Sequence, residues 1–263
     1  MKTNRHFSLS RLGMLFKQDF IENHRQLLLA SGFALLLLSV LSISISLNFS
    51  ALSDDSHFNT MCIHVERGWF IAAFIIFGMI AGSSLFTTLK TPAGRLSTLM
   101  IPASQLEKFI ERWLIVVPGY ILLFILIGTI ADLVRVGFCE WILHRNVTMI
   151  QPHDFFDTDS LPRKYFVATL GFLSLQSFFV LGSVVWQKFA MVKTFWAMVF
   201  IGGAYFLTGI ALMEWLHNPG TAYPEPEFLK TDTVPCIIAS LVTLFNYSVA
   251  YLRLRESEII NRW

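Results

Sequence analysis

The sequence is short of charged residues. Only 14% of its 263 residues are Asp, Glu, Lys or Arg, whereas a soluble domain has roughly 25%. A soluble protein needs polar residues over its surface however large its core, so this shortage excludes an ordinary soluble fold. The net charge of +2 is too small to indicate a nucleic-acid partner. Hydrophobic residues make up 54% of the chain, and the solvent that this composition favours is lipid.

The sequence also has few cysteines and none of the common metal-binding, catalytic or phosphate-binding motifs considered below. The three cysteines, Cys62, Cys139 and Cys236, form no C-x-x-C or Cys/His metal pattern. The chain has no H-E-x-x-H, no G-x-S-x-G and no G-x-x-x-x-G-K-[ST] phosphate loop. We therefore predict no metal site, no catalytic residue and no ATP hydrolysis in this chain. The cysteines are expected on or near the non-cytoplasmic side, where a disulfide and three free thiols are both open.

Six long stretches carry no charged residue and no histidine. Crossing about 30 Å of hydrocarbon takes roughly 20 residues of helix, and a backbone in lipid must satisfy its own hydrogen bonds. The sequence therefore predicts an all-α integral membrane protein, with six transmembrane helices in a single domain, residues 1–263. Pro118 is expected to kink the third helix. The six stretches are Leu27–Leu47, Trp69–Leu89, Trp113–Ala131, Tyr165–Trp186, Phe195–Met213 and Val234–Leu252.

The distribution of Lys and Arg predicts the orientation. With six spans, 14 of these residues lie at the two termini and in the second and fourth loops, and 6 lie in the other three loops. Positive residues concentrate on the cytoplasmic side of membrane proteins. Both termini are therefore expected in the cytoplasm, which in a bacterium places the chain in the inner membrane.

The segments between the spans differ in character. Residues 8–26 have apolar side chains at helical spacing with charges between them, which predicts an amphipathic helix on the membrane surface. The stretches 48–68, 132–164 and 214–233 are acidic, and the last two contain proline; we expect all three to be modest outer loops. The apolar part at 132–143 either continues the third helix or lies at the interface.

The second cytoplasmic connection, residues 91–112, is the most informative segment. Ser104-Gln-Leu-Glu107 is a capping box that begins a helix leading into the third span. Pro102, just before it, stops any helix arriving from the other side. A short, partly apolar helix is expected between Pro92 and Pro102. Either the membrane surface or a groove on a partner protein can cover such a helix.

The run Gly94-Arg-Leu-Ser-Thr-Leu-Met-Ile-Pro-Ala-Ser104, followed by Glu107-Lys108, resembles the loop between the second and third spans of ABC type-2 transporter permeases. The version with Pro-Ala-Ser and Glu-Lys looks like that of permease-like proteins of Bacteroidetes. The chain departs from the family pattern in having no acidic pair before Gly94.

The resemblance implies a membrane subunit that pairs with a second permease subunit, identical or related. A separate ABC ATP-binding subunit would hold ATP and Mg²⁺, and this chain would hold no cofactor. In the family, the loop is a coupling helix seated on that ATPase. The residues implied in this contact are Arg95, Leu96, Leu99, Met100, Pro102, Ser104, Glu107 and Lys108.

A few polar and small residues inside the spans are further candidates. Gly78 and Gly82 form a G-x-x-x-G that permits close helix packing, in a dimer or within one subunit. Gln176 and Asn246 can line a substrate path or hydrogen-bond a neighbouring helix.

The function we expect is that of the permease subunit of an ABC exporter with an unknown substrate. One alternative is a membrane enzyme whose polar groups, Asp132, Glu214 and His217, converge at the outer leaflet. The other alternative is an accessory membrane protein that transports nothing.

Overall fold

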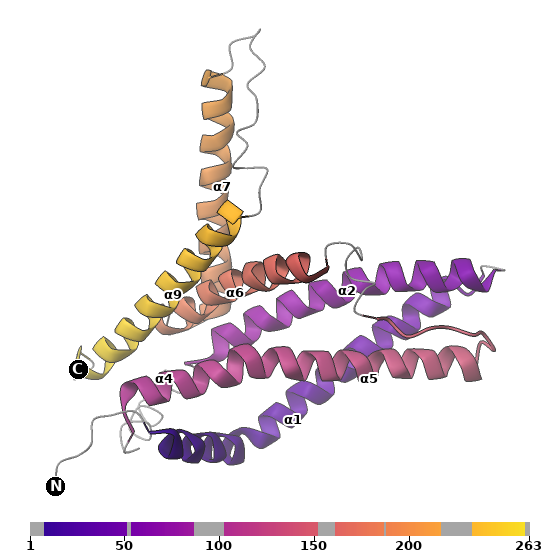
Figure 1. The fold of residues 1–263 in the computed structure, drawn as a ribbon, viewed down its shortest axis with the longest axis horizontal. Coiled ribbons are helices and arrows are strands. Elements are labelled where there is room, and N and C mark those ends of the chain that lie inside the picture. Colours follow the sequence, from indigo (N-terminus) through magenta and orange to yellow (C-terminus); the bar gives the residue numbers. More distant parts are fainter. Residues whose placement is uncertain are drawn as a thin grey trace. The chain divides into compact units, whose positions relative to one another are not determined.

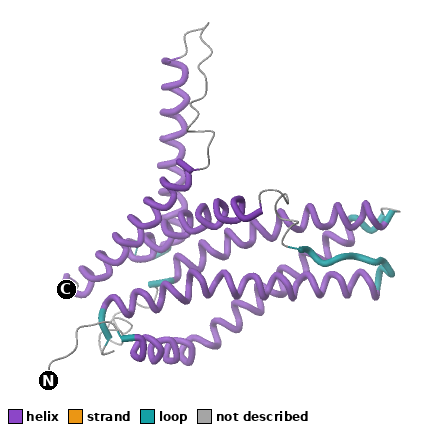
Figure 2. Tube along the Cα trace, in the orientation of Figure 1, coloured by secondary structure: helices purple, strands orange, loops and turns teal. Residues whose placement is uncertain are grey.

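The computed structural model describes residues 8–51, 54–86, 103–151, 161–186, 188–216 and 233–260. Throughout these residues the regular structure is helical (Figures 1 and 2). Six helical segments are long and apolar enough to cross a membrane. The prediction of a six-helix membrane protein is therefore confirmed at this level. The segment predicted as the coupling helix, about residues 93–101, lies outside the described residues.

The chain divides into two units. Unit 1 consists of α1 (Leu9–Asn48), most of α2 (Asp55–Ser84), α4 (Gln105–Leu114), η2 (Ile115–Gly119), α5 (Tyr120–Trp141) and the segment that follows α5. Unit 2 consists of the last residues of α2, most of α6 (Leu161–Val185), α7 (Ala190–Leu216) and α9 (Thr233–Ile260).

Helix α1 is one continuous helix of 40 residues, which is about 60 Å long at 1.5 Å per residue. The separate surface helix predicted over 8–26 is instead the first part of this helix, because residues 14–31 contain no proline or glycine that would end a helix near the predicted boundary. The ribbon of α1 changes direction after its indigo first part (Figure 1). This length is about twice the hydrocarbon thickness of a bilayer.

The core of unit 1 lies where α1, α2 and α5 meet. One apolar cluster joins the middle parts of the three helices and is formed by Ala34, Leu38, Phe70, Ile127 and Ala131. A second cluster lies toward the end of unit 1 where α1 and α5 end and α2 begins, which we call the far end. Its members are Ile45, Phe58, Cys62, Cys139 and Val147. The opposite end, where α1 and α4 begin, is called the near end.

Two helices of unit 1 extend beyond their uncharged stretches at the far end. Helix α2 begins at Asp55, where the sequence was expected to form a loop up to residue 68. Asp54 precedes it, and the hydroxyl and amide of Ser56 donate hydrogen bonds to its carboxylate at 2.7 and 3.2 Å. These hydrogen bonds lower the pKa of the Asp54 carboxyl. Helix α5 continues to Trp141, as one of the two alternatives for 132–143 predicted. At its other end α2 stops at Ser84, before the expected Leu89.

Pro118 lies within a π-helical turn rather than a simple kink. The turn, η2, covers Ile115–Gly119 and joins α4 to α5 without a break. Proline has no amide hydrogen for an α-helical bond, and the wider i→i+5 pattern of a π-turn accommodates one extra residue. Just beyond the turn, the Tyr120 hydroxyl donates a hydrogen bond of 2.6 Å to the Phe74 carbonyl oxygen of α2.

Unit 2 exposes much of its apolar surface. In α7 the exposed fractions of Phe200, Tyr205, Phe206 and Leu207 are 72%, 76%, 69% and 66%. An apolar helix surface of this kind needs lipid or another chain to cover it. The six membrane-spanning segments and this exposure agree in making the chain an integral membrane protein.

Candidate functional site

The near end of unit 1 is organised by the carboxylate of Glu107. Its Oε2 accepts a hydrogen bond of 2.8 Å from the Ser104 amide, and the Glu107 amide donates back to the Ser104 hydroxyl at 3.2 Å. This is the capping box that the sequence predicted for α4. The second oxygen, Oε1, accepts a 2.8 Å hydrogen bond from the amide of Ser8, the residue before α1. One carboxylate therefore caps the starts of two helices.

Electrostatics favour this arrangement. Each helix start has unsatisfied amide groups and the positive end of the helix dipole, and both stabilise a nearby carboxylate. Arg11 of α1 adds a third favourable contact, with its Nη2 3.3 Å from Glu107 Oε1. Glu107 is completely buried. The start of α1 and the start of α4 are consequently held together by a single buried charge.

The structure places only part of the predicted partner-binding set. Arg95, Leu96, Leu99, Met100 and Pro102 lie outside the described residues. Ser104, Glu107 and Lys108 lie at the start of α4, and the side chains of Glu107 and Lys108 are buried within the chain. Their described surroundings are thus intramolecular, and their role toward a partner stays a prediction.

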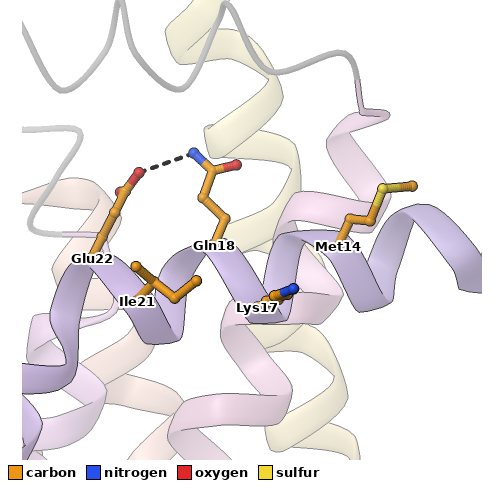
Figure 3. Close-up of a pocket in the computed structure, with 5 residues that line it drawn as sticks. All are labelled: Met14, Lys17, Gln18, Ile21 and Glu22. Atoms are coloured by element: carbon orange, nitrogen blue, oxygen red, sulfur yellow. Dashed lines mark hydrogen bonds between the residues drawn. The ribbon is translucent and has the colours of Figure 1, made fainter.

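A shallow hollow lies on the first part of α1 (Figure 3). The Gln18 side-chain amide donates a 3.0 Å hydrogen bond to Glu22 along its edge. All the residues that line it belong to this one helix, so it is a feature of the helix surface and not an enclosed site. They are Met14, Lys17, Gln18, Ile21 and Glu22.

In unit 2, the two polar residues expected on a substrate path are buried between helices. The exposed fractions of Gln176 and Asn246 are 1% and 3%. The Asn246 side-chain amide donates a 2.9 Å hydrogen bond to the Ser177 hydroxyl, which links α9 to α6. The sequence left two roles open for Asn246, a substrate path or a hydrogen bond to a neighbouring helix, and the hydrogen bond is present in the structure. A role for either residue in transport stays a prediction.

Glycines allow the helices of unit 2 to approach closely. A Cβ atom at Gly82 would lie 3.2 Å from the Gln176 Cγ and 3.3 Å from the Phe179 Cβ, so α2 and α6 pack tightly here. Gly182 is in a still closer contact, because a Cβ there would overlap the hydroxyl of Thr194 on α7. The sequence singled out Gly82, with Gly78, but not Gly182, which belongs to no G-x-x-x-G pair.

The far end of unit 1 contains a buried charge cluster that the sequence analysis did not predict. Arg135 of α5 is completely buried, and its Nε lies 2.8 Å from Glu66 Oε2 of α2. The same guanidinium donates two hydrogen bonds, of 2.9 and 2.7 Å, to Oδ1 of Asp132 one turn earlier. A usable signal existed: Glu66 precedes one uncharged stretch by three residues and Arg135 follows another by four. Opposite charges at such positions can pair when the helices are antiparallel neighbours.

The segment after α5 folds back onto this cluster. Residues 142–151 form the loop that follows α5 (Figure 2). Arg135 Nη2 donates to the Thr148 carbonyl oxygen at 3.0 Å, and the Ile150 amide donates to Asp132 Oδ2 at 2.8 Å. Two hydrogen bonds also join the side chain of Asn59 to Thr148. The cluster therefore ties α2, α5 and the returning chain together.

The described residues give little support to the alternative function as a membrane enzyme. Both oxygens of Asp132 already accept hydrogen bonds within the cluster. The side chain of Glu214 and the whole of His217 lie outside the described parts. Where the structure describes the chain, it holds no group of three His, Cys, Asp or Glu residues placed to bind a metal.

The cysteines are free thiols. Cys62 and Cys139 are buried in the same apolar cluster of unit 1, and Cys236 is half-buried in unit 2. The sequence left open a disulfide or three free thiols, and in the structure all three thiols are free.

Comparisons with known proteins identify no relative. No family model, no curated protein and no solved structure matches this chain. Its function must therefore be argued from its own residues.

Proposed function

We propose that this chain is the membrane-spanning subunit of an ABC transporter, an exporter, in a bacterial inner membrane with both termini in the cytoplasm. The proposal rests first on the sequence of residues 94–108, which resembles the coupling loop of ABC type-2 permeases. The six membrane-spanning segments and the missing phosphate loop support it, because such a subunit relies on the ATPase of a partner.

The connection made by Glu107 is the structural observation that carries the proposal. The predicted coupling helix, about residues 93–101, is followed in the sequence by Ser104, the residue that caps the start of α4. From there α4, η2 and α5 continue without interruption through the third span. A displacement of the coupling segment would therefore be passed to the third span, and through the Ser8 amide on Glu107 to α1 as well.

The partners follow from this arrangement. The ATP-binding subunit would seat Leu96, Leu99 and Met100 in a groove, with Arg95 as a polar contact, and would carry ATP and Mg²⁺ itself. A second permease subunit, identical or related, would complete the path for the substrate. The exposed apolar surface of α7 would face lipid or that subunit.

The first observation to make is whether the adjacent gene encodes a phosphate-loop ATPase, and the experiment is a binding test with that ATPase co-expressed. We expect the double variant Leu96→Glu/Leu99→Glu to lose the ATPase during purification, because charged side chains cannot occupy an apolar groove. The matched control is Ile142→Glu, an apolar residue that follows α5, is 62% exposed and lies at the far end of unit 1, outside residues 91–112. Equal recovery of the ATPase with the double variant would show that the coupling role is wrong.

A further inference from the structure

The charge cluster at the far end of unit 1 does not balance. Its three charged members are Glu66, Asp132 and Arg135, with exposed fractions of 1%, 3% and 0%. If both carboxyls are ionised, two negative charges face one positive charge, and the cluster has a net charge of −1. An uncompensated charge is very costly in such a buried position.

The two carboxyls are not equally satisfied. Asp132 accepts two hydrogen bonds from Arg135 and one from the Ile150 amide, so both of its oxygens have partners. Neither oxygen of Glu66 receives a hydrogen bond of acceptable geometry, although Arg135 Nε is 2.8 Å from Oε2. The Nε–H group hydrogen-bonds to Asp132 instead. A buried carboxylate with no hydrogen bond on either oxygen is rare and needs an explanation.

Two further polar atoms at this place have no hydrogen-bond partner, namely Nη1 of Arg135 and the hydroxyl of Ser42 on α1. The side chain of Ser42 is 1% exposed. It lies near enough to the Glu66 carboxyl for the two side chains to hydrogen-bond, and a hydrogen bond donated by Ser42 would favour the ionised carboxylate. A hydroxyl can accept a hydrogen bond as well as donate one, so it is suited to face a protonated carboxyl group.

We propose that Glu66 is a proton-binding site and that it carries a proton while α1, α2 and α5 are packed as in this structure. One proton brings the cluster from −1 to neutral. It also turns Glu66 into a hydrogen-bond donor beside the Ser42 oxygen. Among the described residues, Cys62 on the same helix also interacts with Glu66, and it is a thiol that supplies no countercharge.

Release of the proton would leave a bare carboxylate among buried side chains, against Asp132 and next to a single arginine. The contact of α2 with α1 and α5 at the far end would then be weakened. The far end of unit 1 is thereby sensitive to pH. This property follows from the cluster alone and is independent of the ABC transporter proposal.

The test is infrared difference spectroscopy of the full-length protein reconstituted in lipid vesicles at neutral pH. A protonated carboxyl has a C=O stretching band that an ionised carboxylate lacks. We expect this band in the wild-type protein and its loss in Glu66→Gln. The control variant Glu140→Gln, which removes an exposed glutamate of α5, should keep it. An identical band in wild type and Glu66→Gln would overturn the proposal, and a water molecule would then be the better partner for the unsatisfied atoms.

A second variant tests the charge balance directly and does not depend on the folding of Glu66→Gln. In Asp132→Asn the cluster has one negative and one positive charge, and it is neutral without a bound proton. Glu66 should then ionise, and the C=O band should disappear although Glu66 is still present. Persistence of the band in Asp132→Asn would show that the charge count does not govern this site.

Discussion

Replacing Glu107 by alanine should free the starts of two helices at once. The change removes the acceptor for the amides of Ser8 and Ser104. A hydrogen bond to a charged group contributes about 1.5–3 kcal/mol, and water entering the truncated site would recover part of the loss. The partly exposed Arg11 contact adds at most about 1 kcal/mol. We expect local opening to become easier by about 2–4 kcal/mol, which is a factor of roughly 30 to 700 at 1.4 kcal/mol per tenfold.

Amide hydrogen exchange of the purified protein, read by mass spectrometry, measures this opening. Peptides covering the first turns of both α1 and α4 should exchange faster in Glu107→Ala, while peptides from the far end of unit 1 should be unchanged. Glu107→Gln keeps an acceptor oxygen without the charge and should have a smaller effect. The control is Glu22→Ala, which removes an exposed glutamate of α1. If α1 exchanges at the wild-type rate in Glu107→Ala, the shared cap does not hold the near end together.

Three further predictions concern packing and charge, and thermal unfolding in detergent checks each of them. Arg135→Met should destabilise unit 1 by about 3–5 kcal/mol, because the buried Asp132 carboxylate loses its counterion; a loss as small as that of an exposed arginine would contradict this. Gly182→Ala should cost about 1–3 kcal/mol by overpacking, whereas Gly171→Ala, with nothing within 4 Å of its added Cβ, should be neutral or stabilising. Asn246→Leu and Ser177→Ala should each weaken unit 2, and their double variant should reveal a coupling of about 0.6 kcal/mol, which independent sites would not show.

The six apolar spans and their helical form could be predicted from the sequence, because the backbone of a segment that crosses lipid must satisfy its own hydrogen bonds. An uncharged stretch of about 20 residues has to be helical to satisfy its hydrogen bonds. Outside lipid this constraint ends, and local capping and packing decide where a helix begins. Helix α2 therefore starts at Asp55, next to the hydrogen-bonded Asp54, and not at Trp69.

The sites show the same division between local and distant contacts. The bond between Ser104 and Glu107 spans three positions and was predictable from the capping pattern. The contact of Glu107 with Ser8 joins residues 99 positions apart, and no local pattern indicates it. The pairing of Glu66 with Arg135 depends on which helices become neighbours. The distribution of charged residues along the sequence predicts the orientation in the membrane, but it does not show which charged residues pair with one another.

The π-turn at Ile115–Gly119 amounts to a one-residue insertion in a long helix. The side chains before and after such an insertion stay on the same faces of the helix only because the π-turn accommodates the extra residue locally. Deleting Pro118 would remove the extra residue of the π-turn. It would also remove the one position without an amide hydrogen, so α4 and α5 would join as one regular α-helix. A shortened chain of this kind would preserve the Glu107 cap at one end and the Arg135 cluster at the other. A single-residue deletion inside α5 would instead rotate everything beyond it by about 100°.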